Sequence, residues 1–194
     1  NVENLKNVDG LAGCENLESC LINSQYGDQI CGNLENLNGL KGINKIKELD
    51  IPASSILINL DGLAGMDGLR KINLNAKNFK FTQKIPQIRG VNIKSATKTL
   101  ESIGNLTNLT HVVIKDCTEL ENLNGLEAAK SIQSVIIQDC KSLKDVTALL
   151  ALPKLQTFKM RSCGLKKGDV PENLKFIFES NISHQDDLPY EFDE

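Results

Sequence analysis

The chain has 194 residues, of which 40% are hydrophobic and 24% charged, and this balance is typical of a folded globular protein. Its formal net charge of −3 argues against a broad nucleic-acid surface, which needs clustered lysine and arginine. No apolar run approaches the roughly 18 residues of a membrane-spanning helix, and no signal peptide is visible.

Short segments of alternating apolar and polar residues recur along the chain. They open at Leu17, Ile46, Leu69, Ile88, Leu109, Ile132 and Leu155, at intervals of 29, 23, 19, 21, 23 and 23 residues. The last three are the most alike, and each reads apolar-x-x-apolar-x-apolar-x-x-Cys. The alternation predicts β-strands whose fourth and sixth positions face a core. The first unit carries extra residues at 24–30, which we interpret as a projecting loop.

A second pattern, Leu-x-Asn-Leu-x-Gly-Leu or a variant of it, precedes or follows these segments. It is found at residues 5–11, 34–40, 57–63, 120–126 and 143–149. Apolar residues at every third position predict 3₁₀ turns or short helices with one stripe facing inward. When strand, turn and returning segment repeat, neighbouring strands run parallel. A unit of this length cannot bury its apolar face alone and must stack on copies of itself.

The repeated form resembles the leucine-rich repeat from about Leu5 to Leu174, and it is similar to the short repeats of bacterial internalins and to the receptor L domain. The resemblance implies an α/β solenoid of about seven repeats. Its concave side would be a curved parallel β-sheet, and its convex side would hold 3₁₀, short helical or irregular segments. The units at Leu69 and Ile88 depart from the pattern, since Lys77 and Ala96 stand in the place of the cysteine.

The pattern predicts one leucine-rich-repeat domain at residues 1–176, with an incomplete first repeat at 1–16, and a C-terminal cap with an acidic tail at 177–194. The first methionine is Met66, so we expect a chain processed or cut from a longer one. Residues 184–194 carry five acidic residues and no lysine or arginine. We interpret them as a solvated terminus, and an acidic contact arm stays open as an alternative.

The six cysteines follow the repeat and not a disulfide or zinc pattern. Four share the site directly after a strand, and Cys14 and Cys20 fall on positions assigned to the interior, so all six are predicted to be buried. In the resembling family this post-strand site implies a column that hydrogen-bonds the backbone of the bend. The four post-strand cysteines are Cys31, Cys117, Cys140 and Cys163.

We predict no catalytic residue, no metal site and no cofactor. There is no Cys-x-x-Cys pair near a histidine and no glycine-rich phosphate motif. The triplet Asn-x-Ser/Thr occurs at Asn105, Asn108 and Asn181, and it would matter only in a eukaryotic secretory route.

The outward strand positions 3, 5 and 7 should form the concave face, and they supply the candidate partner-binding residues. Val113 and Ile136 are predicted to be neighbours in the central row, with basic residues as a border, which is the composition of a protein-binding patch. The basic border favours an acidic partner. Strand propensity and solubility alone are the alternative explanation. The candidates are Lys94, His111, Val113, Lys115, Ser134, Ile136, Gln138, Lys159 and Arg161.

We therefore predict a non-catalytic protein–protein interaction domain that binds a protein partner through its concave face. Two alternatives stay open: a structural or adhesive segment of a larger cell-surface or secreted protein, and an inhibitor or regulator that blocks an enzyme or toxin. A secreted or cell-surface location is slightly favoured over a cytoplasmic one. The oligomeric state and the identity of the partner are left open by the sequence.

Overall fold

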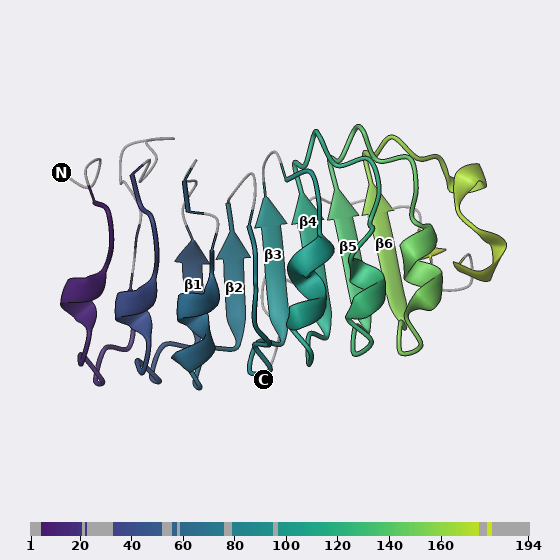
Figure 1. The fold of residues 1–194 in the computed structure, drawn as a ribbon. Helices are drawn as coiled ribbons and strands as arrows, with labels where there is room; N and C mark the ends of the chain where they lie inside the picture. The colour runs from purple at the N-terminus through teal and green to yellow at the C-terminus, as the bar shows by residue number, and fades with distance from the viewer. Residues whose placement is uncertain are drawn as a thin grey trace.

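The computed structural model describes residues 5–20, 22, 33–51, 56–57, 59–75, 79–94, 97–174 and 178–179. In these residues, parallel strands lie side by side in chain order, as Figure 1 shows for the six that carry labels there. The predicted leucine-rich-repeat architecture is confirmed. The strands are β1 (Glu48–Ile51), β2 (Lys71–Leu74), β3 (Gly90–Lys94), β4 (His111–Lys115), β5 (Ser134–Gln138), β6 (Thr157–Arg161) and β7 (Phe178–Glu179).

The register of the sheet agrees with the repeat frame. Strands β1 to β6 each begin two residues after the predicted opening, even in the two short units. Ile137 pairs with Ile114 on one side and with Met160 on the other, and all three are at most 8% exposed. Equivalent residues therefore stack in columns, and the sixth position of each of these units faces the core.

The first predicted unit differs. Residues 17–20 and 22 belong to no strand in the described part of the chain, although Ile22 is 4% exposed, as its inward position requires. The loop predicted at 24–30 and Cys31 lie outside the described residues, and so does the predicted boundary at residues 176 and 177. Strand β7 extends the sheet by pairing with β6, at Phe158 with Phe178 and Lys159 with Glu179.

Short 3₁₀ helices form the returning side of most coils in the described residues, as the spacing predicted, and Figure 1 shows these helical turns in front of the sheet. The short unit between β2 and β3 has no such helix in its described residues. Asn36 and Asn122 start their turns in the same way, because each side-chain oxygen accepts the backbone N–H two residues further on, at 3.0 Å. The helices are η2 (Asp9–Leu11), η3 (Asn38–Leu40), η4 (Asp61–Gly65), η5 (Glu101–Asn105), η6 (Leu126–Ala128), η7 (Thr147–Ala151), η8 (Lys167–Asp169) and η9 (Glu172–Leu174).

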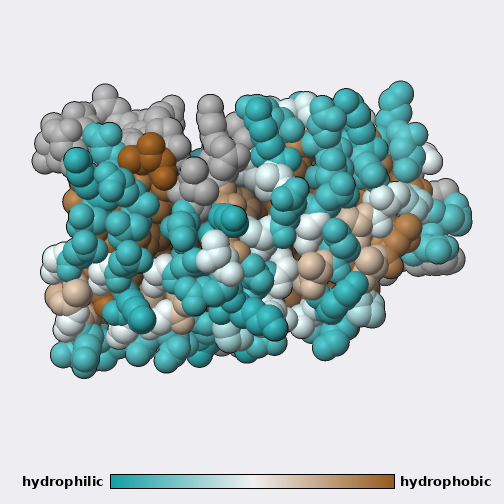
Figure 2. All heavy atoms as spheres, viewed as in Figure 1, coloured by the Kyte–Doolittle hydropathy of each residue, from teal (hydrophilic) through white to brown (hydrophobic). Residues whose placement is uncertain are grey.

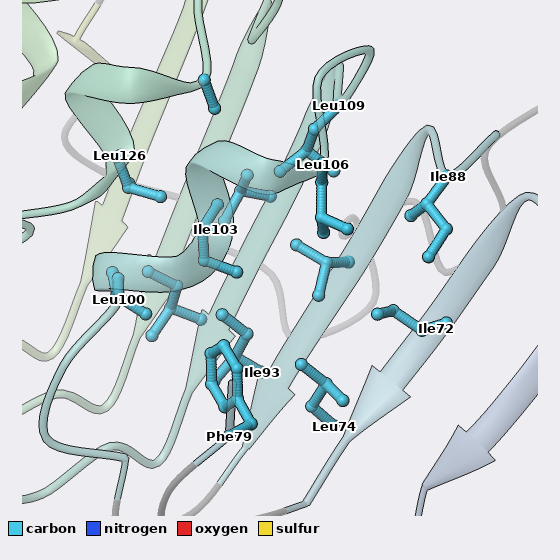
Figure 3. Packing of buried hydrophobic residues seen from close by; sticks show 14 of the residues in the cluster. Ile72, Leu74, Phe79, Ile88, Ile93, Leu100, Ile103, Leu106, Leu109 and Leu126 are labelled. Carbon is cyan, nitrogen blue, oxygen red and sulfur yellow. The ribbon is translucent and has the colours of Figure 1, made fainter. Parts of the chain in front are cut away.

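The core is a continuous strip between the sheet and these turns. Figure 3 shows Leu100, Ile103 and Leu106 directed from the segment around η5 toward side chains of the sheet such as Ile93. All four are 0% exposed. Figure 2, which views the molecule from the side of the turns, shows a surface that is hydrophilic over most of its area. In the returning segments, the apolar residues at every third position thus face inward, and the polar residues between them face the solvent.

In the short unit after β2, aromatic side chains form part of the buried core. Phe79 and Phe81 are 8% and 1% exposed, and their ring centroids lie 5.8 Å apart. This unit is fastened to the preceding one by Asp61, whose carboxylate accepts hydrogen bonds from the Thr82 backbone N–H, at 2.8 Å, and from the Thr82 hydroxyl. Burial acts to raise the pKa of Asp61, but the hydrogen bonds from Thr82, with smaller contributions from Asn59 and Gln83, together outweigh it, so the pKa is lowered.

Candidate partner-binding surface

The sheet face opposite the helical turns holds the candidate residues in three rows, which we call the concave face. The register aligns Lys94 with Lys115, and Lys115 with Gln138, in the upper row. The central row and the lower row are aligned in the same way. On β3 to β6 the central row is Asn92, Val113, Ile136, Lys159, the lower row is Gly90, His111, Ser134, Thr157, and the upper row ends at Arg161. All nine predicted candidates therefore lie together.

Charge is one-sided on this part of the sheet. The outward positions of β3 to β6 include four basic side chains and no acidic one. Partial burial lowers the pKa of Lys115, and the charge of Lys94 beside it lowers it further. Asp116 and Asp139, at the ends of β4 and β5, act in the opposite direction. The cationic form of Lys115 is thus less favourable here than in water, despite the two carboxylates.

The predicted apolar centre is present in register but offers little open surface. Val113 pairs with Ile136, and their side chains are only 8% and 6% exposed. Neither belongs to the core cluster on the other side of the sheet. They form a small apolar area, which we call the apolar floor. The basic residues at nearby outward positions, which we call the rim, are Lys94, Lys115, Lys159 and Arg161. This rim offers a partner more contact surface than the apolar centre that the sequence predicted.

His111 is held in one orientation on the lower row. The hydroxyl of Thr110 donates to the carbonyl oxygen of Arg89 at 3.0 Å and lies 2.8 Å from Nδ1 of His111. Because a hydroxyl has one proton to donate, it must accept from Nδ1–H of the imidazole. Burial lowers the pKa of His111, so the ring is neutral near pH 7 with its proton on Nδ1.

A directional network of amides occupies the first strands of the same face. Nδ2 of Asn73 donates to the carboxylates of Glu48 and Asp50 at 2.7 and 2.5 Å, and Oδ1 of Asn73 accepts from Nδ2 of Asn92 at 2.6 Å. The carboxylates therefore fix both amides with their oxygens toward β4. Lys71 completes the network through an ion pair with Glu48 at 2.9 Å. The sequence analysis did not predict this network. Its signal was the row of polar residues Asp50, Asn73 and Asn92 at equivalent outward positions of neighbouring strands.

Two buried oxygens on the concave face find no donor in the part of the chain that the structure describes. They are Oδ1 of Asn92 and Oε1 of Gln138. An unpaired buried acceptor costs about 1–3 kcal/mol. A bound segment that brought N–H groups to these two positions would remove this cost.

The cysteines correct part of the sequence interpretation. Cys117 and Cys140 are 0% exposed as predicted, but Cys14 is exposed, and Cys20 and Cys163 are partly exposed. Cys14 lies after η2 in the first described coil, so no preceding coil among the described residues packs against it. The five described cysteines are free thiols, and Cys31 lies outside the described residues.

The post-strand cysteines form the column that the family resemblance implied. The thiols of Cys117, Cys140 and Cys163 donate to the carbonyl oxygens of Lys115, Gln138 and Arg161, at 3.4, 3.3 and 3.2 Å. Neighbouring thiols also influence each other's ionisation. The thiol of Cys140 lowers the pKa of Cys117, while the thiol of Cys117 raises the pKa of Cys140 to about 12.

This difference in exposure predicts selective modification. In the native chain we expect iodoacetamide to modify Cys14 first, with Cys117 and Cys140 reacting roughly a hundredfold more slowly, because they react only after local opening. Peptide mass spectrometry against reaction time measures the rates. In denaturant all the thiols should react alike, and equal rates in the native chain would contradict the burial of the column.

The two described Asn-x-Ser/Thr sites already have structural roles. Nδ2 of Asn105 donates to the carbonyl oxygen of Phe81 at 2.5 Å, and Nδ2 of Asn108 donates to that of Pro86 at 3.0 Å. Each amide ties one coil to the preceding one. A glycan on either nitrogen would replace one of these hydrogens and disturb the contact.

Among the described residues, no three or more His, Cys, Asp or Glu side chains are grouped so as to hold a metal ion. In the same residues, no helix has the length and apolar character needed to cross a bilayer.

Comparison with known proteins adds one structural relationship. No protein-family model and no curated protein match the chain. The crystal structure of internalin C2 from Listeria monocytogenes str. 4b F2365 is similar, with a TM-score of 0.50 and 19% identity over 77% of this chain and 72% of that one. At this identity the similarity concerns the fold alone. Together with the register and the repeated turns, it identifies the chain as a leucine-rich-repeat solenoid.

Proposed function

We propose that the chain is a non-catalytic recognition domain that binds an acidic segment of a protein partner on the concave face of β3 to β6. The observation that carries this proposal is the one-sided charge of that face. Lys94, Lys115, Lys159 and Arg161 occupy outward positions there, and no acidic residue shares those positions.

Electrostatics favour a carboxylate-bearing ligand at this rim. Lys94 and Lys115 are direct neighbours in the register, and the charge of Lys94 lowers the pKa of Lys115. A ligand carboxylate near both would offset their repulsion. Adjacent strands lie about 4.8 Å apart, so Lys94 on β3 and Lys115 on β4 are close enough for one acidic segment to contact both, while Lys159 and Arg161 lie two strands beyond Lys115 on β6. Attraction of this kind speeds encounter and weakens with salt.

Specificity would come from the uncharged residues between the cations. His111 presents a neutral, oriented ring, and Ser134 and Gln138 add polar groups beside it. Val113 and Ile136 form the apolar floor below. Because this pattern is fixed by sheet register, a partner would meet a rigid surface and would lose little affinity to ordering of the receptor.

The test is selection of peptides from a displayed random library on the full chain. We expect acidic peptides to be enriched. The double variant Lys115→Glu with Lys159→Glu should weaken their binding by about tenfold or more, which corresponds to about 1.4 kcal/mol. Fluorescence anisotropy of a labelled selected peptide measures the affinity.

The matched control is Lys141→Glu with Lys154→Glu, which makes the same charge change at exposed positions outside the concave face. It should leave the affinity unchanged. Aspartate at Val113 and Ile136 is a poorer test, since it would place charges on side chains that are 8% and 6% exposed and would disturb folding. An equal loss of peptide affinity in the two double variants, or enrichment of basic peptides in the selection, would contradict the proposal.

A further inference from the structure

We propose that residues 184–194 of this same chain bind the concave face as an internal acidic ligand, in competition with an external partner. This inference rests on the surface assigned under the proposed function and names its first occupant. The segment carries five acidic residues, Asp186, Asp187, Glu191, Asp193 and Glu194, and no lysine or arginine. The face carries four basic residues and no acidic one on β3 to β6.

The segment also brings apolar side chains. Leu188, Tyr190 and Phe192 alternate with other residues, most of them acidic. A ligand that combines carboxylates with apolar groups matches a face in which Val113 and Ile136 form a floor within a basic rim. A purely acidic segment would match the rim but not the floor.

The chain is long enough to reach the face. Strand β7 pairs directly with β6, with Glu179 opposite Lys159 in the central row. Three strand spacings, about 14 Å, separate β7 from β4. Residues 180–184 can span roughly 17 Å when extended, so residues 184–194 can lie over β4 to β6 without moving the sheet.

The unpaired acceptors add a second, independent argument. Oδ1 of Asn92 and Oε1 of Gln138 are buried and find no donor among the described residues. The amide network holds the Asn92 oxygen toward β4, where the ligand would lie. Backbone N–H groups of a peptide laid across the face are suitable donors, as in other modes of peptide recognition that use main-chain bonds.

A fluorescent reporter can test this in the full chain, because the sequence contains no tryptophan. Tyr190→Trp places a single indole in the segment. If it is bound, the indole should be shielded from acrylamide. Adding Lys115→Glu with Lys159→Glu, or about 0.5 M salt, should raise the quenching constant about threefold and shift the emission to longer wavelength.

Two further variants keep the test decisive. Lys141→Glu with Lys154→Glu in the Tyr190→Trp chain should leave quenching unchanged, since these exposed lysines lie off the concave face. Should the first rim pair fail to fold, as judged by circular dichroism, Lys94→Glu with Arg161→Glu makes the same change of charge at other rim positions. An indole that is equally accessible in all folded chains would overturn the proposal.

The outcome also separates this inference from the proposed function. If the indole is accessible throughout but selected acidic peptides still lose affinity for the rim variant, the internal ligand is wrong and the recognition surface stands. If neither effect is seen, both proposals fail. Shielding that increases with protein concentration would assign the segment to a second copy of the chain, which overturns binding within one molecule.

Discussion

Replacing Gly125 with alanine is expected to lower the free energy of unfolding by about 3 kcal/mol, because two unfavourable effects coincide. The φ angle of Gly125 is +108°, a region that L-residues avoid. A Cβ there would lie 2.4 Å from the carbonyl carbon and oxygen of Leu100. Backbone of the preceding coil cannot move aside as a flexible side chain can. Urea denaturation followed by circular dichroism measures the loss.

Gly10 provides the matched control, since it occupies the same place in its own repeat. A Cβ on Gly10 would meet no atom within 4 Å, and its φ is not in the left-handed region. Gly10→Ala should therefore change stability by less than about 1 kcal/mol, in the stabilising direction. A large loss in both variants would mean that the motif needs glycine for a reason other than the close approach of neighbouring coils.

Truncation of Ile137 to alanine is expected to cost about 3–4 kcal/mol, because the side chain is 0% exposed and its loss leaves a cavity. Ile137 lies between Ile114 and Met160 in the same inward column. A repeat array transmits stability mainly between neighbours, so the damage should concentrate on β4 to β6. Hydrogen exchange of the full chain should show lost amide protection there and smaller changes in β1 and β2.

Leu150→Ala is the control for this column, since Leu150 is 47% exposed on the turn side of the same coil. Its truncation should change stability by less than about 0.5 kcal/mol. Uniform loss of protection along all strands after Ile137→Ala would instead mean that the solenoid unfolds as one cooperative unit, contrary to the nearest-neighbour expectation.

The arrangement of the candidate surface follows from the repeat. Because equivalent positions stack at the strand spacing, the period that predicted Ile114, Ile137 and Met160 as one inward column also predicted Lys94 beside Lys115 and Val113 beside Ile136. A slip of one residue would have exchanged the two faces of every strand. The register excludes such a slip from β1 to β6, so all nine candidates lie on one face.

The amount of each side chain left in solvent was not predictable from the period. Val113 and Ile136 are on the outward face as expected, yet they are 8% and 6% exposed. Cys14 was assigned to the interior stripe but is exposed. Periodicity gives the direction of a side chain, whereas its exposure depends on the size and position of neighbours from other coils.

The sequence alone determined the coil, its parallel strands, the 3₁₀ turns and the column of post-strand cysteines, because each depends on a local pattern that is repeated. Tertiary structure decided how an imperfect unit closes around Phe79 and Phe81, how Asp61 fastens it through Thr82, and which way the amides of Asn73 and Asn92 point. These features depend on contacts between residues of different coils. Their energies are set by distances of closest approach, which the order of residues along one coil does not contain.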